Sequence, residues 1–139
     1  LMSVNTNGLD QNWFKSKRSE YFEVTGKLFI KFSGGTELIL QSNHNVEEDI
    51  LYVELPNKSI WIINEDNGTA QKSKEDILNG RIEFQSELTA AMVTKILKNG
   101  TSDLTTLKQS SGQHEIFLDA MLEHWNFSNK CNDKRVPIT

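Results

Sequence analysis

The sequence predicts an α+β domain in which a four-stranded antiparallel meander, at about residues 20–64, is packed on one face by two amphipathic helices. Three observations predict this class. The first half is rich in β-branched and aromatic residues, and turn residues divide it into short runs. The second half carries apolar residues at helical spacing, at about residues 86–98 and 113–126. The strands and helices also stand in separate blocks, whereas a parallel α/β fold alternates them.

The chain of 139 residues fits a single domain, 1–139, which is long enough to bury a core without disulfides. Residues 1–12 are polar and contain Asn7-Gly8, so they predict a flexible N-terminal arm. Residues 128–139 carry Lys130, Lys134 and Arg135 and predict a polar C-terminal tail.

Two hairpins account for most of the predicted sheet. Ser33-Gly34-Gly35 supplies a turn between residues 28–32 and 36–41, and one face of these strands is apolar. Pro56-Asn57-Lys58 supplies a second turn, between residues 50–55 and 59–64. Successive hairpins indicate an antiparallel meander.

The helix predicted at 86–98 begins at Ser86, a good N-cap, and ends before Gly100. Its apolar residues share one stripe: Leu88, Met92, Val93, Ile96 and Leu97. Burying the stripe returns on the order of 10 kcal/mol, and fixing about twelve backbone positions costs at least as much. We therefore expect this helix to need a partner surface, which the sheet would provide.

The helix predicted at 113–126 has a similar apolar face. Its members are Ile116, Phe117, Ala120, Met121, His124 and Trp125. His124 lies near the C-terminal end, where a protonated imidazole is favoured by the helix dipole.

Charge and composition disfavour several classes of function. The net charge of −4 gives no overall basic field to attract nucleic acid or an anionic membrane. Trp13 with Lys15, Lys17 and Arg18 could still clamp a nucleic-acid strand. Because of the negative net charge, nucleic-acid binding is the weakest of the three hypotheses. No apolar run approaches the roughly 20 residues of a membrane helix, and the chain starts without a signal-peptide pattern. With a single cysteine, we expect a soluble cytoplasmic protein.

No pattern specifies catalysis, a cofactor or a metal. His44, His114, His124 and Cys131 lack the close pairing of zinc ligands. The chain also lacks a nucleophile elbow and a nucleotide-binding glycine motif.

Two groups are candidate binding residues. The first is the acidic triplet Glu47, Glu48 and Asp49, which could bind a cation or a basic partner or could simply be solvated. The second is Trp61 together with Tyr52 of the neighbouring strand. Residues 60–63 are apolar on both faces, so that strand is either covered on both sides or meets a partner.

The leading hypothesis is a non-enzymatic domain that binds another protein, or itself as a homodimer, in the manner of an inhibitor, an immunity protein or an accessory factor. The alternative is a small-molecule-binding or enzymatic domain with a pocket between sheet and helices. Glu23 or Glu54 would then handle protons, if burial raised the pKa of either carboxyl group.

Overall fold

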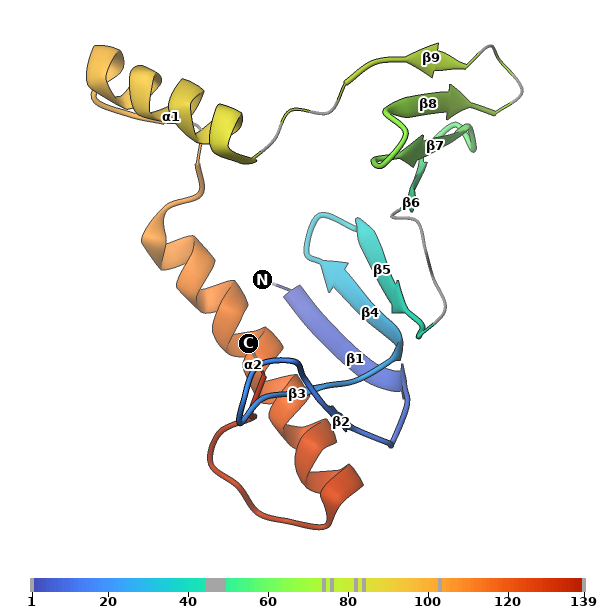
Figure 1. The fold of residues 1–139 in the computed structure, drawn as a ribbon, viewed down its shortest axis with the longest axis vertical. Coiled ribbons are helices and arrows are strands. Elements are labelled where there is room, and N and C mark those ends of the chain that lie inside the picture. The colour runs from blue at the N-terminus through green and yellow to red at the C-terminus, as the bar shows by residue number, and fades with distance from the viewer. Residues whose placement is uncertain are drawn as a thin grey trace. The chain divides into compact units, whose positions relative to one another are not determined.

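The structure is a computed structural model that describes residues 2–44, 50–73, 75, 77–81, 83, 85–102 and 104–138. The α+β class is confirmed, since two helices accompany antiparallel sheets (Figure 1). The sequence predicts a single domain, and contacts within the chain define two compact units. The first unit combines Leu1–Asn45 with Thr105–Thr139, and the second is Val46–Leu104.

The first unit contains one helix and five strands: β1 (Met2–Leu9), β2 (Phe14–Lys15), β3 (Phe22–Glu23), β4 (Gly26–Phe32), β5 (Glu37–Ser42) and α2 (Leu107–Asn129). The second unit contains one helix and four strands: β6 (Ile50–Glu54), β7 (Ile60–Asn64), β8 (Thr69–Lys72), β9 (Leu78–Asn79) and α1 (Gln85–Asn99).

The four-stranded antiparallel sheet exists, but it spans residues 50–79 in the order β6-β7-β8-β9. The predicted range of 20–64 is therefore wrong. Both predicted hairpins are present, and β4 and β5 belong to a separate three-stranded sheet of order β1-β4-β5. Turn residues predict that two strands adjacent in the sequence pair with each other. They carry no information about a strand that is distant in the sequence and joins the same sheet.

That third strand is β1, so the flexible N-terminal arm is a wrong prediction for Met2–Leu9. Met2 and Val4 pack against the core and alternate with exposed polar residues. Near the end of β1 the backbone approaches β4 so closely that a Cβ at Gly26 would lie 2.5 Å from the Gly8 oxygen. Gly26 also has φ +111°, which a residue with a side chain rarely adopts.

The core of the first unit lies between the three-stranded sheet and α2, which contacts β1 (Figure 1). Leu28, Ile30 and Met121 are buried together at its centre. The alternation of Leu28, Ile30 and Phe32 along β4 thus marks the inner face of the strand, as the sequence predicts.

α2 begins six residues before the predicted start because Thr106 caps it. The Thr106 hydroxyl accepts a hydrogen bond from the Gln109 N–H at 3.3 Å, and the Gln109 side chain accepts one from the Thr106 N–H at 3.1 Å. This reciprocal pair is a capping box. Lys130, in the left-handed conformation, ends the helix.

The segment after α2 is polar in composition but is packed against the first unit, so the prediction of a tail is wrong. The Asp133 carboxylate accepts a hydrogen bond from the Trp125 indole at 2.8 Å. The Phe22 N–H donates to the Pro137 carbonyl oxygen at 2.8 Å. Val136 and Ile138 then pack against the core.

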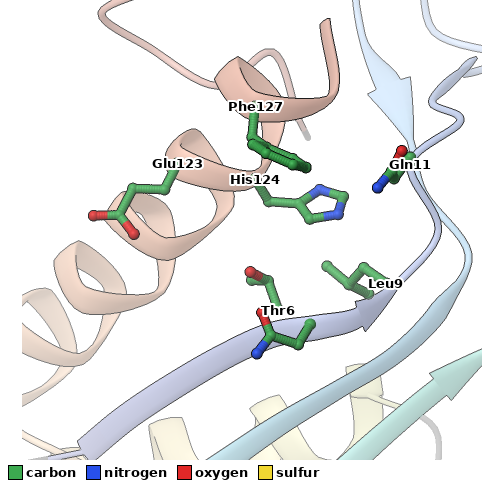
Figure 2. A pocket seen from close by; sticks show the side chains of 7 residues that line it. Thr6, Leu9, Gln11, Glu123, His124 and Phe127 are labelled. Atoms are coloured by element: carbon green, nitrogen blue, oxygen red, sulfur yellow. The ribbon is translucent and has the colours of Figure 1, made fainter. Parts of the chain in front are cut away.

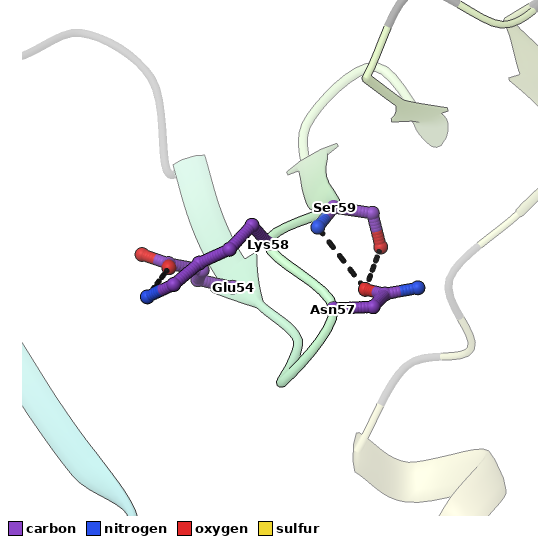
Figure 3. Close-up of polar contacts among 4 residues, drawn as sticks. All are labelled: Glu54, Asn57, Lys58 and Ser59. Atoms are coloured by element: carbon purple, nitrogen blue, oxygen red, sulfur yellow. Dashed lines mark hydrogen bonds and ion pairs between the residues drawn. The ribbon is translucent and has the colours of Figure 1, made fainter.

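In the second unit, the turn between β6 and β7 is stabilised by its own side chains (Figure 3). Asn57 Oδ1 accepts hydrogen bonds from the backbone and hydroxyl of Ser59, at 3.1 and 2.7 Å. Lys58, at φ +65°, reaches Glu54 at 2.9 Å. This hydrogen bond and the charge of Glu54 raise the pKa of Lys58.

The helix predicted at 86–98 is present as α1, but within its unit it contacts no strand among the described residues. Its apolar stripe is largely exposed, up to 81% for Leu97. Among the described residues, the expected packing of a helix on a sheet within one unit is seen for α2 and β1. No helix in the described ranges is long and apolar enough to cross a membrane.

Candidate functional site

The two aromatic residues predicted to form a binding surface lie on opposite faces of the four-stranded sheet. Tyr52 is directly opposite Ile62 across the β6–β7 pair, and Trp61 is opposite Val53. Directly opposed residues share a face, and neighbours along a strand alternate. The prediction that Tyr52 joins Trp61 on one surface is therefore wrong.

We name the exposed side of this sheet the Tyr52 face. It carries four apolar side chains, which are all exposed: Ile50, Tyr52, Ile60 and Ile62. Tyr52 is the most exposed of them, at 64%. Polar residues such as Gln71 and Thr69 occupy the same face on β8. An apolar centre with a polar margin is the composition expected of a protein interface.

The opposite side carries Trp61 and is partly covered. Val53, Trp61, Ile63 and Ala70 are half-buried on that side, whereas Leu51 and Leu78 are 41% and 57% exposed. Trp61 is therefore half-buried and Tyr52 exposed. Of the two predicted environments of residues 60–63, cover on both sides is not seen, because Ile60 and Ile62 are exposed.

The remaining candidates of the sequence are the acidic triplet and two carboxylates of the predicted strands. Glu47, Glu48 and Asp49 lie outside the described residues. Glu23 and Glu54 are exposed, so neither is the buried acid or base of the alternative hypothesis. Glu23 accepts a hydrogen bond from the Ser16 hydroxyl at 2.6 Å, and Glu54 pairs with Lys58.

A pocket lies in the first unit, between β1 and α2, and the sequence did not indicate the residues that line it (Figure 2). Its volume is about 300 Å³. Seven residues line it: Thr6, Asn7, Leu9, Gln11, Glu123, His124 and Phe127.

His124 is the most buried of the lining residues, with 8% of its surface exposed. Burial lowers its pKa, and a hydrogen bond to the Leu9 backbone partly offsets that effect. Burial therefore favours the neutral imidazole, whereas the position near the helix end alone favours the protonated one. Nδ1 of His124 is buried and has no hydrogen-bond partner among the described residues.

His124 belongs to an aromatic cluster through its contact with Trp13. The Trp13 ring lies 5.6 Å from the imidazole and 5.2 Å from Trp125, measured between ring centroids. Phe22 lies 5.0 Å from Trp125. Trp13 is therefore half-buried in a hydrophobic cluster rather than presented to a nucleic-acid strand.

Comparison with protein-family models, curated proteins and solved structures finds no match. The candidate sites of this chain are the Tyr52 face and the pocket between β1 and α2.

Within the described ranges, no three or more His, Cys, Asp or Glu side chains converge as metal ligands. The residues that line the pocket were missed because they come from two distant segments, 6–11 and 123–127. The spacing of His124 with Met121 and Trp125 did place it on the inner face of a helix, and that was the available signal.

Proposed function

We propose that this chain is a protein-binding domain that docks its partner through the Tyr52 face, and that the partner is a second copy of the same chain. The observation that carries the proposal is that all four apolar side chains of this face, Ile50, Tyr52, Ile60 and Ile62, are exposed on a regular sheet. Large exposed apolar patches are typical of interaction sites.

A second copy suits this face because a two-fold axis pairs one surface with itself. Glu54 is the one charged residue among the described positions of β6 and β7 on this face, and it is already paired with Lys58. Two such faces can therefore meet without opposing unpaired like charges at their centre.

The apolar surface that a dimer would bury sets its expected affinity. Covering what remains exposed of each side chain contributes about 1 kcal/mol, so eight side chains in a dimer contribute about 8 kcal/mol. Much of this is offset by the entropy lost on association. We therefore expect weak association, with a dissociation constant above about 1 μM.

Sedimentation velocity over a concentration series from about 10 μM to about 1 mM tests the proposal. The test variant is Tyr52→Thr combined with Ile62→Thr, which removes a directly opposed pair and keeps β-branched residues in the strands. The matched control is Ile39→Thr on β5, since Ile39 is 58% exposed and lies in the other sheet.

We expect the wild type and the control to sediment faster as concentration rises, and the double variant to dissociate at least about tenfold more readily. A wild type that stays monomeric throughout would contradict self-association. Equal weakening in the control would place the interface elsewhere. The narrower roles of inhibitor, immunity protein or accessory factor, and the cytoplasmic location, stay predictions from the sequence.

A further inference from the structure

We propose that Asn67, which precedes Gly68 in the turn between β7 and β8, is a site of spontaneous deamidation that introduces an isoaspartate linkage into this turn. The reagent is water, and the reaction needs no enzyme or cofactor. The proposal concerns this turn and does not depend on self-association through the Tyr52 face.

The reaction requires a reactive backbone nitrogen directly after the asparagine. The Gly68 nitrogen bonds to Cγ of Asn67, the Cγ–Nδ2 bond breaks, and ammonia leaves with the proton that the Gly68 nitrogen loses. Water then opens the resulting cyclic succinimide at either of its carbonyl carbons. One opening gives aspartate, and the other gives isoaspartate, in which the main chain runs through the former side-chain carbonyl carbon. Glycine favours the ring closure because it has no side chain to hinder the approach.

Asn-Gly pairs are present at four places in the chain, which begin at Asn7, Asn67, Asn79 and Asn99. All four asparagines are exposed, so the access of water does not distinguish them. The pairs differ in the hydrogen bonding of the glycine nitrogen. Ring closure turns this nitrogen towards the asparagine side chain, so an N–H that is already donated must first lose its acceptor.

Three of the pairs are held by a sheet or a helix. The Gly80 N–H donates to the Gly68 carbonyl oxygen at 2.8 Å, and the Gly100 N–H donates to the Ile96 carbonyl oxygen at 2.8 Å, at the end of α1. Gly8 pairs with β4, and a Cβ at Gly8 would lie 2.7 Å from a backbone oxygen of that strand. These backbones cannot turn without breaking contacts of the sheet or helix that holds them.

The backbone around Asn67 has more freedom to react. Residues 65–68 form the turn that follows Asn64 and precedes Thr69, the last pair of the β7–β8 ladder. The Asn67 N–H donates to Asn64 Oδ1 at 2.9 Å, so the turn is held by a group that takes no part in the reaction. In the described part of the chain, neither the Gly68 N–H nor the Asn67 carboxamide makes a hydrogen bond. Both reacting groups are therefore available.

The product changes the four-stranded sheet. An isoaspartate adds one methylene group to the main chain between β7 and β8, and a carboxylate replaces the neutral carboxamide. The Gly68 oxygen accepts the hydrogen bond of Gly80, so the change lies where two strand pairs meet. We expect the amide signals of Asn64, Thr69 and Gly80 to shift in the isoaspartate form. Asn67→Asp gains the charge without the methylene group and should shift them less.

Peptide mapping of the full chain tests the proposal, because trypsin places each Asn-Gly pair in a separate peptide. These peptides span residues 1–15, 59–72, 75–81 and 99–108. The folded chain and a sample unfolded in urea are aged in mildly alkaline H₂¹⁸O buffer, digested at intervals and analysed by tandem mass spectrometry. Uptake of ¹⁸O marks the converted residue, and labelling by an isoaspartyl methyltransferase identifies isoaspartate.

In the folded chain we expect Asn67 to convert first. Asn79 and Asn99 should convert at least about fivefold more slowly, which is the factor expected for breaking one backbone hydrogen bond. In urea the four rates should converge, because the chain no longer holds its backbone N–H groups. Asn67→Gln should remove the fast conversion, since its longer side chain disfavours ring closure. The matched control Asn79→Gln should leave the fast conversion unchanged.

The proposal is overturned if peptide 59–72 converts no faster than the other three in the folded chain, or if its ¹⁸O is found at Asn64. It is also overturned if urea leaves the relative rates unchanged, because the sequence and not the structure would then set them. Asn67 and Asn79 are both exposed, so we expect both glutamine variants to fold. The dispersion of their amide spectra verifies this.

Discussion

His124 illustrates how burial can reverse the chemistry that a sequence position indicates. The end of a helix favours a protonated imidazole, but this imidazole is enclosed by Trp13, Trp125 and the end of β1. Burial lowers the pKa of His124 and so favours the neutral ring. The apolar spacing of α2 predicted an inward-facing histidine, whereas the depth of its burial depends on β1, which the sequence did not place.

The lowered pKa of His124 predicts that the chain loses stability in mild acid. The ordinary pKa is 6.5, so as pH falls through 6.5 the unfolded chain binds this proton before the folded chain does. The loss continues until pH reaches the folded pKa. We expect His124→Phe, which keeps an aromatic ring beside Trp13, to reduce the decrease in the free energy of unfolding between pH 7.5 and pH 5.5.

Urea denaturation at several pH values measures this dependence. Thr6→Val serves as the control, because it alters the same pocket without removing a titratable group and should keep the wild-type slope. An unchanged slope in His124→Phe would mean that the proton is taken up equally in both states.

At the scale of elements, the sequence predicted both helices and both hairpins but not what covers them. α1 and α2 each show an apolar stripe, and only α2 has a buried one. The capping box of Thr106 and Gln109 was visible as a motif and would have extended α2. The Asn-rich composition of β1 hid an alternating pattern that becomes meaningful only beside β4.

The contrast between the two helices predicts unequal effects of equivalent truncations. Met121→Ala removes a side chain that is 5% exposed and should cost about 2–5 kcal/mol of unfolding free energy. Leu97→Ala removes one that is 81% exposed and should cost less than about 0.5 kcal/mol. Urea denaturation followed by circular dichroism at low protein concentration compares them. A comparable loss for both would show that the α1 stripe is buried in solution.

At the scale of the whole molecule, the first unit is built from two segments that are distant in the sequence. The residues of the second unit come between these segments along the chain. A pattern of local hairpins and helices cannot predict this division, because it depends on which segments pair over long separations. The buried residues identify the stronger unit. Among the described residues, all of them, including Leu28, Ile30, Met121 and Trp125, lie in the first unit.

This distribution predicts that the first unit folds without the second. Replacing residues 46–104 with a flexible Gly-Ser linker of about ten residues should preserve the cluster of Trp13, Phe22 and Trp125, because its ring contacts lie within the first unit. We expect cooperative thermal unfolding, near-ultraviolet circular dichroism of the packed aromatic rings, and amide signals of residues 2–44 and 105–138 close to those of the full chain.

The isolated 46–104 segment is the counterpart, and it should unfold without cooperativity because none of its described side chains is buried. A shortened chain that retains helix but loses its near-ultraviolet signal would instead show that the second unit is needed to fix the core of the first.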